Sequence, residues 1–180
     1  MKYLFLFMAT ISITACSFET SQELSDIKQM IVKLDSAKNI YKSIDWKYYK
    51  ELNSKINKNM KFISDNIDAV TVADKDFIKY TGPYSTTGKI INRVFRKKIK
   101  KIDFEIDFSA KQLQNLSNDV KKQLITDSDS LSFYITQEKD ALDNLLNKIS
   151  DVKNILEVQK KAYEKTHTKV DSLIATIKQN

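Results

Sequence analysis

Residues 131–177 read LSFYITQEKDALDNLLNKISDVKNILEVQKKAYEKTHTKVDSLIATI and carry the clearest periodic pattern in the chain. Positions taken alternately three and four apart along it form one stripe, and eleven of the fourteen are apolar. A spacing of 3.5 held over about six heptads is typical of a coiled-coil seam. We therefore predict a helix from about Ser130 to Lys178, about 73 Å long. Its seam is Leu131, Ile135, Glu138, Leu142, Leu145, Ile149, Val152, Leu156, Gln159, Tyr163, Thr166, Val170, Leu173 and Ile177.

The middle of the chain carries a second stripe of the same kind. A helix built on it would be about 57 Å long, and Thr86 or Thr87 can cap its start. Capping side chains for the C-terminal helix stand at residues 127–130. The middle stripe consists of Phe95, Ile99, Ile102, Ile106, Leu113, Leu116, Val120 and Leu124.

The first part of the chain holds two shorter stripes that differ in phase. They consist of Leu24, Ile27, Ile31, Leu34 and Tyr41, and of Tyr49, Leu52, Ile56, Met60, Ile63, Ile67 and Val70. Between them lie residues 43–46, where Ser43 or Asp45 can cap a new helix. No Gly or Pro forces a reversal there, so a kink and a hairpin both remain open.

Glycine and proline are scarce and fall in one place. An average chain of this length would hold about 12 Gly and 8 Pro, whereas this chain has two Gly and one Pro, all within residues 82–88. We predict one irregular stretch, residues 71–88, with a short helical turn over residues 74–81. Its large apolar groups are expected to cap the end of the bundle, with partner binding as the alternative: Phe77, Ile78, Tyr80 and Tyr84.

These lengths predict an all-α fold. Residues 20–70, taken as one broken helix, match the last helix in length, and the middle helix with its turn nearly matches both. We predict an elongated antiparallel helical bundle, or coiled coil, of three long rods, the first broken near Asp45. The alternative is a four-helix bundle with a hairpin at residues 43–46.

The side chains that catalysis requires are missing from the pattern. His167 is the single histidine, and the heptad count places it beside the seam, with no second His or Cys near it to bind a metal. No phosphate-binding glycine loop or nucleophile elbow is visible. We therefore expect no enzyme activity, no metal and no cofactor. Three polar residues in the seam, Glu138, Gln159 and Thr166, are interpreted as layers that set register, with ligand binding as the alternative.

A basic run follows the predicted loop. Arg93, Arg96, Lys97 and Lys100 share one face of an α-helix by their spacing, opposite the apolar stripe. Two readings stay open: a solvated face, balanced by Asp103, Glu105 and Asp107, or contact with an anionic partner. In the three-rod fold the loop before the run lies at the far end, about 75 Å from residue 16, so a wall polymer or protein suits the run better than a membrane. With a hairpin at residues 43–46 the loop would return to the membrane, and the run could touch anionic lipid.

The first residues differ in kind from the rest. Lys2 precedes an apolar run through Thr14, which is too short to span a membrane and has the layout of a signal peptide. Ile13-Thr14-Ala15-Cys16 resembles the lipobox of bacterial lipoproteins. The resemblance implies cleavage after Ala15 and a diacylglycerol on Cys16, and two or more acyl chains suffice for stable anchoring. It divides the chain into a leader (1–15), a lipidated tether (16–19) and one helical domain (20–180).

Loss of the leader removes one basic residue and lowers the net charge from +7 to +6. This excess suits anionic neighbours at a cell envelope, and we expect no nucleic-acid partner. Ser17 stands where inner-membrane-retained lipoproteins carry aspartate, so the resemblance favours the outer membrane in a cell that has one. Three triplets resemble the O-glycosylation acceptor motif of Bacteroidetes envelope proteins: Asp35-Ser36-Ala37, Asp129-Ser130-Leu131 and Asp171-Ser172-Leu173. The composition, together with the lipobox, resembles that of small lipoproteins of the same phylum.

Our leading expectation is a non-enzymatic envelope lipoprotein that acts as a helical scaffold or partner-binding rod. The alternatives are a holdase-like periplasmic chaperone and a binder of cell-wall polymer through the basic face at residues 93–101. The pattern predicts neither the partner nor the oligomeric state.

Overall fold

A computed structural model describes residues 21–179, apart from the side chain of Val72, and it is an elongated all-α bundle. Its helices are α1 (Ser21–Lys42), α2 (Trp46–Asp65), α3 (Ile67–Ala73), α4 (Ile78–Val94), α5 (Lys100–Lys121) and α6 (Ser128–Gln179). A π-helical segment, η1 (Phe95–Ile99), joins α4 to α5 without a turn. The predicted leader, Cys16 and the tether up to residue 19 lie outside the described residues. No helix among those described is long and apolar enough to cross a bilayer.

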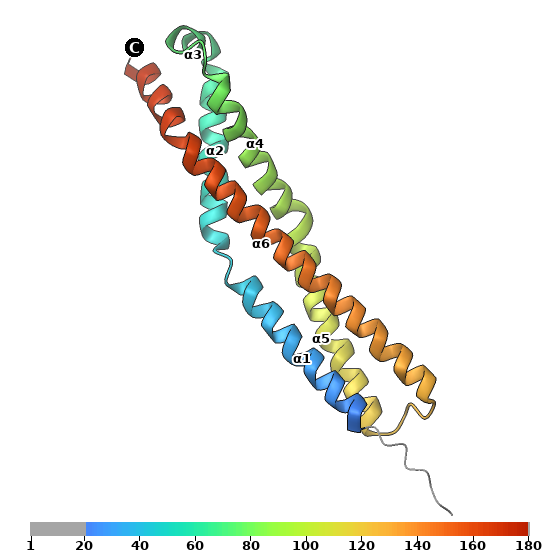
Figure 1. Cartoon of the computed structure of the whole chain (residues 1–180). Coiled ribbons are helices and arrows are strands. Elements are labelled where there is room, and N and C mark those ends of the chain that lie inside the picture. The colour runs from blue at the N-terminus through green and yellow to red at the C-terminus, as the bar shows by residue number, and fades with distance from the viewer. Residues whose placement is uncertain (1–20, 180) are drawn as a thin grey trace, which may run out of the picture.

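The helices form three rods, as predicted. In Figure 1, α1 and α2 run end to end in one direction, α4, η1 and α5 return, and α6 extends along the whole bundle. Accordingly α1 packs against α5 and α6, whereas α2 packs against α4 and α6. The break near Asp45 is therefore an interruption within one rod, and the alternative hairpin is wrong.

Local capping explains why the first rod breaks without Gly or Pro. The carboxylate of Asp45 accepts a hydrogen bond from the backbone N–H of Tyr48 at 2.9 Å, which starts α2. The Ser43 hydroxyl donates to the carbonyl of Ile40 at 2.7 Å and helps to end α1. Ile44, in the break itself, is only 6% exposed. The core therefore continues through the interruption.

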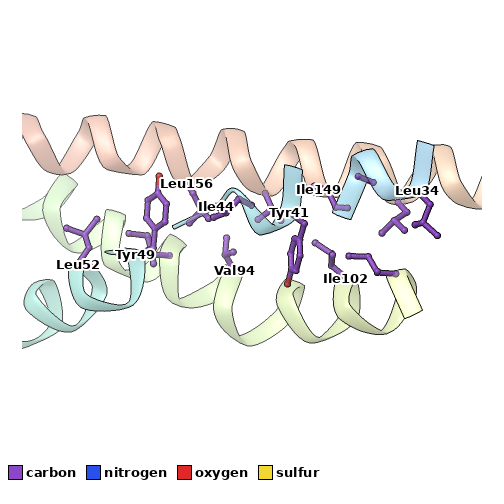
Figure 2. Packing of buried hydrophobic residues seen from close by; sticks show 14 of the residues in the cluster. Leu34, Tyr41, Ile44, Tyr49, Leu52, Val94, Ile102, Ile149 and Leu156 are labelled. Carbon is purple, nitrogen blue, oxygen red and sulfur yellow. The ribbon is translucent and has the colours of Figure 1, made fainter. Parts of the chain in front are cut away.

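The predicted seam of α6 is the spine of the core. Ten of its fourteen members are buried, including the polar Gln159 and Thr166, and Ile135, Glu138, Tyr163 and Ile177 are partly exposed. Figure 2 shows Leu34, Ile102 and Ile149 meeting between the three rods. The buried apolar residues run from Ile27 to Ile174. Residues 21–179 thus contain a complete core and can fold without the preceding segment.

The loop predicted at residues 71–88 is much shorter in the structure. The chain reverses over residues 74–77, and α4 already begins at Ile78, so Gly82, Pro83 and the proposed caps Thr86 and Thr87 lie inside a helix. The carboxylate of Asp74 organises the turn: it accepts hydrogen bonds from the backbone N–H of Asp76 at 2.8 Å and from the Tyr80 hydroxyl at 2.7 Å. An aspartate therefore makes the turn that glycine and proline were expected to make.

Gly88 serves packing rather than a turn. A Cβ placed on it would lie 2.6 Å from Cγ2 of Ile56 in α2, whereas a Cβ on Gly82 would meet nothing within 4 Å. A separation of 2.6 Å is far inside carbon–carbon contact. Gly88 is therefore the residue that lets α4 approach α2 closely.

Two of the predicted stripes end differently from the expectation. Ile67 is 45% exposed because α2 ends at Asp65 and α3 starts in a new phase, and Leu124 is 65% exposed because α5 ends at Lys121. The chain after α5 turns through Gln123, whose φ of 53° lies in the left-handed region. The backbone N–H of Leu124 donates to the Asp119 carbonyl and that of Gln123 to the Val120 carbonyl, which is the Schellman pattern usually completed by glycine.

Candidate functional site

The basic run occupies the join between α4 and α5. Arg93 ends α4, Arg96 and Lys97 lie in η1, and Lys100 starts α5; all four side chains are exposed. Together with Lys98 and Lys101 they form what we call the basic surface. In residues 21–179 none of these six side chains takes part in an ion pair, and the nearby Glu105 pairs instead with Lys148 of α6 at 2.8 Å. The surface therefore carries uncompensated positive charge.

The basic surface lies at mid-length and not near the far end. The ring of Phe95 contacts that of Trp46 at 6.0 Å between centroids, and Trp46 in turn packs on Tyr41 at 5.1 Å. These aromatic rings pack against the core beside the break between α1 and α2. Lys97 lies 24 residues before the end of α5, about 36 Å along the rod. The run therefore lies nearer than the far turn to the end of the bundle where α1 begins, because α4 places a helical stretch between that turn and the run.

The π-helical segment changes which basic residues lie together. Residues in a π-helix turn through a smaller angle than in an α-helix, so the spacing rule that grouped Arg93, Arg96, Lys97 and Lys100 does not hold across residues 95–99. The structure instead gathers Lys97, Lys98 and Lys101 with Lys148, and Asp151 lines the same cleft. These five residues and Ile102 line a shallow cleft of about 270 Å³.

Two exposed phenylalanines next to the basic surface were missed in the sequence. Phe104 and Phe108 are 67% and 52% exposed, and their rings stack at 5.9 Å on the outer face of α5. The signal that would have found them is their phase: they are one turn apart but out of step with the stripe of Ile102 and Ile106. Lys101 precedes them and Lys111 follows them on the same face, and Glu105 and Asp107 also lie within one turn.

A polar cluster joins α2, α4 and α6 in the far half of the bundle. The Lys55 ammonium lies 2.7 Å from the Asp171 carboxylate, and the Asn59 amide donates to Asp171 at 3.1 Å and to the Tyr84 hydroxyl at 3.0 Å. Tyr163 stacks between Tyr84 and His167, at 5.7 Å and 4.7 Å. The hydrogen bond to Asp171 raises the pKa of Lys55, and burial raises the pKa of Tyr84 to about 12. Each group has a structural partner, and the cluster contains no nucleophile activated by a base.

The remaining candidates from the sequence are dispersed along the bundle. Glu138 is partly buried in a shallow cleft between α5 and α6, and burial raises the pKa of its carboxyl. Gln159 is buried, and the Thr166 hydroxyl donates to the Ala162 carbonyl at 3.0 Å. Of the apolar groups near the far turn, Tyr84 is fully buried, whereas Ile78 is 67% exposed. Among the described residues there is no group of three or more His, Cys, Asp or Glu placed to hold a metal ion.

Fold and site together define an elongated three-rod helical bundle with a basic surface at mid-length. Comparison of the chain with protein families, with curated proteins and with solved structures finds no match.

Proposed function

We propose that this chain is a non-enzymatic, lipid-anchored envelope lipoprotein, a rigid helical rod that presents a basic surface to an anionic partner. The anchor rests on the resemblance of Ile13–Cys16 to a lipobox. The geometry of the bundle suits such an anchor, because α1 begins at one end of the rod, beside the end of α5 (Figure 1). A tether at that end would leave the whole length of the rod accessible.

The observation that carries the partner-binding part is the unpaired charge of the basic surface. A basic face that only keeps a helix solvated is usually interleaved with carboxylates that neutralise it. Here Glu105, one of the carboxylates that follow the run, is held by Lys148, and six basic side chains lie within nine consecutive residues without an ion pair among the described residues. Such a surface attracts anionic polymers, acidic proteins or phospholipid head groups, and the attraction weakens as salt rises.

The anchor is tested by lipid labelling in cells. Labelled palmitate should enter the wild-type protein and a Ser17→Ala control but not Cys16→Ser, and only Cys16→Ser should leave the membrane fraction. A Cys16→Ser protein that stays in membranes through high-salt and carbonate washes would overturn the lipoprotein assignment.

The basic surface is tested by charge removal. Arg96, Lys97 and Lys100 are changed together to Gln, and a control carries Lys47→Gln, Lys50→Gln and Lys58→Gln on the exposed face of α2. Both proteins lose three charges and should keep their helicity. Retention on isolated native envelope at low salt should fall for the first triple variant only. Equal retention of both would mean that the basic surface is merely solvated.

A further inference from the structure

The outer face of α5 carries a regular strip of exposed residues that we call the α5 strip: Lys101, Phe104, Phe108 and Lys111. They follow one another at spacings of three, four and three, so they lie above one another on one side of the helix. Lys101 belongs also to the basic surface, which the α5 strip continues toward the end of the rod where α1 begins. The strip therefore combines two large apolar rings with flanking positive charge.

Nothing in the described bundle covers the α5 strip. The opposite side of α5 supplies Ile102, Ile106 and Leu113 to the core, where α1 and α6 pack against it. Phe104 and Phe108 therefore contact each other and solvent, at 67% and 52% exposure. Adjacent exposed aromatic rings with a basic border are typical of an interaction surface.

The charges on and beside the α5 strip indicate what kind of partner can bind to it. A second copy of this chain that presented the same strip would set Lys101 and Lys111 against like charges, and the whole chain is already at +7. The carboxylates on either side are partly engaged: Glu105 pairs with Lys148, and Asp103 lies beside the Tyr41 hydroxyl and helps to raise the pKa of Tyr41, which is raised chiefly by burial. Asp103 and Asp107 are exposed beside the strip. Because the strip ends in Lys101 and Lys111 and continues the basic surface, the occupant that it suits is negatively charged.

The shape of the α5 strip favours an anionic bilayer over an acidic protein as the partner. Phe104 and Phe108 stand on a single helix, and neither ring lines the cleft at Lys101 and Lys148 or the cleft beside Glu138. An interfacial helix of lysines and phenylalanines lies along a membrane surface in this way, with its rings at the boundary between head groups and acyl chains. We propose that the α5 strip is a membrane-contact face, which inserts Phe104 and Phe108 into the head-group region of an anionic bilayer and lays the rod along it.

This inference deepens the proposed function by naming its anionic partner as phospholipid. A lipid on Cys16 would hold the α1 end of the rod at the bilayer, and Phe108 lies 13 residues from the end of α5, about 20 Å along the rod. Tilting the rod toward this face would bring both the α5 strip and the basic surface onto the head groups.

Vesicle binding by residues 21–180 tests the face without any lipid anchor, because this segment contains the complete core. Phosphatidylglycerol vesicles should bind it in a salt-dependent manner, and phosphatidylcholine vesicles should bind it far less. Phe104→Ser with Phe108→Ser should weaken binding by about tenfold or more, since two apolar rings lose their insertion. The matched control, Phe133→Ser with Val158→Ser, removes two residues of similar exposure on α6 and should change binding by less than about twofold.

A fluorophore attached at a single position tests whether the α5 strip itself contacts the vesicle. The segment has no cysteine of its own, so Phe104→Cys and Val158→Cys each accept one environment-sensitive fluorophore. The emission at position 104 should shift to the blue on phosphatidylglycerol vesicles, and that at position 158 should not.

Two outcomes would overturn this inference: vesicle binding that survives loss of both phenylalanines, or no vesicle binding together with strip-dependent capture of an acidic envelope protein. Failure of palmitate to enter the full chain would refute the anchor instead and would leave the vesicle result unaffected.

Discussion

The two glycines of α4 should respond to alanine in opposite directions. Gly→Ala inside a helix normally stabilises a protein by about 1 kcal/mol, because alanine has the higher helix propensity. At Gly82 a new Cβ meets nothing within 4 Å, so Gly82→Ala should gain up to about 1 kcal/mol, less the crowding of the new Cβ by the ring of Pro83.

At Gly88 the same change forces a steric clash. The new Cβ would lie 2.6 Å from Cγ2 and 3.4 Å from Cβ of Ile56, a β-branched side chain that is 1% exposed and has little freedom to move. Overpacking of this kind costs about 1–3 kcal/mol. After the gain in helix propensity of about 1 kcal/mol, Gly88→Ala should lower the free energy of unfolding by up to about 2 kcal/mol.

Urea unfolding of residues 21–180, followed by circular dichroism at 222 nm, measures both changes. Removal of the obstructing methyl group provides the control: in an Ile56→Ala background, Gly88→Ala should become stabilising, which gives a coupling energy of about 2 kcal/mol in a double-mutant cycle. If Gly82→Ala and Gly88→Ala act alike, or if the cycle shows no coupling, the close approach of α4 to α2 is incorrect.

Three further changes test other parts of the structure by the same unfolding assay. Ile149→Asp places a charge at a fully buried seam position and should cost more than about 3 kcal/mol, whereas Asn147→Asp on the exposed side should change stability by less than about 0.5 kcal/mol; similar costs would mean that the seam is misplaced. Gln123→Gly should stabilise the bundle by about 1 kcal/mol, because φ at this position is 53° and glycine adopts it without strain; a loss would contradict the left-handed turn. Burial raises the pKa of the Glu138 carboxyl above its ordinary value of 4.5, so the folded state binds this proton more tightly than the unfolded state. As the pH rises from about 4.5 toward neutrality, the wild type should therefore lose stability relative to Glu138→Gln; a constant difference between the two proteins from pH 4 to pH 7 would show that the carboxyl is solvated.

The hydrophobic pattern alone predicted a large part of the fold. The heptad stripe of residues 131–177 predicts α6 and most of its buried face, because a long repeat at 3.5 residues has no stable alternative to a helix packed along its length. The same reasoning favoured the three rods and named Asp45, beside Ser43, as a cap for the second helix. The basic run could also be predicted from the sequence, since it consists of charged residues that are close together along the chain.

The rest depended on which surfaces meet in three dimensions. Local rules assign Gly82, Pro83 and Gly88 to a loop, but Gly88 lies within a helix because α2 passes so close that no side chain fits. The residues around Asp45 alone could not distinguish a kink from a hairpin, because both are compatible with the same capping side chains. The difference lies in tertiary packing, since α1 packs on α5 whereas α2 packs on α4.

The site shows the same division. The concentration of positive charge at residues 93–101 could be predicted from the sequence, and the phase that sets Phe104 and Phe108 apart from the core stripe was present there but was not used. The packing of the rods, in contrast, places part of the run in a π-helical segment at mid-length and brings Lys97, Lys98 and Lys101 to Lys148. The cause is a change of packing partner: α4 packs on α2 and α6, whereas α5 packs on α1 and α6, and η1 lies where the change occurs.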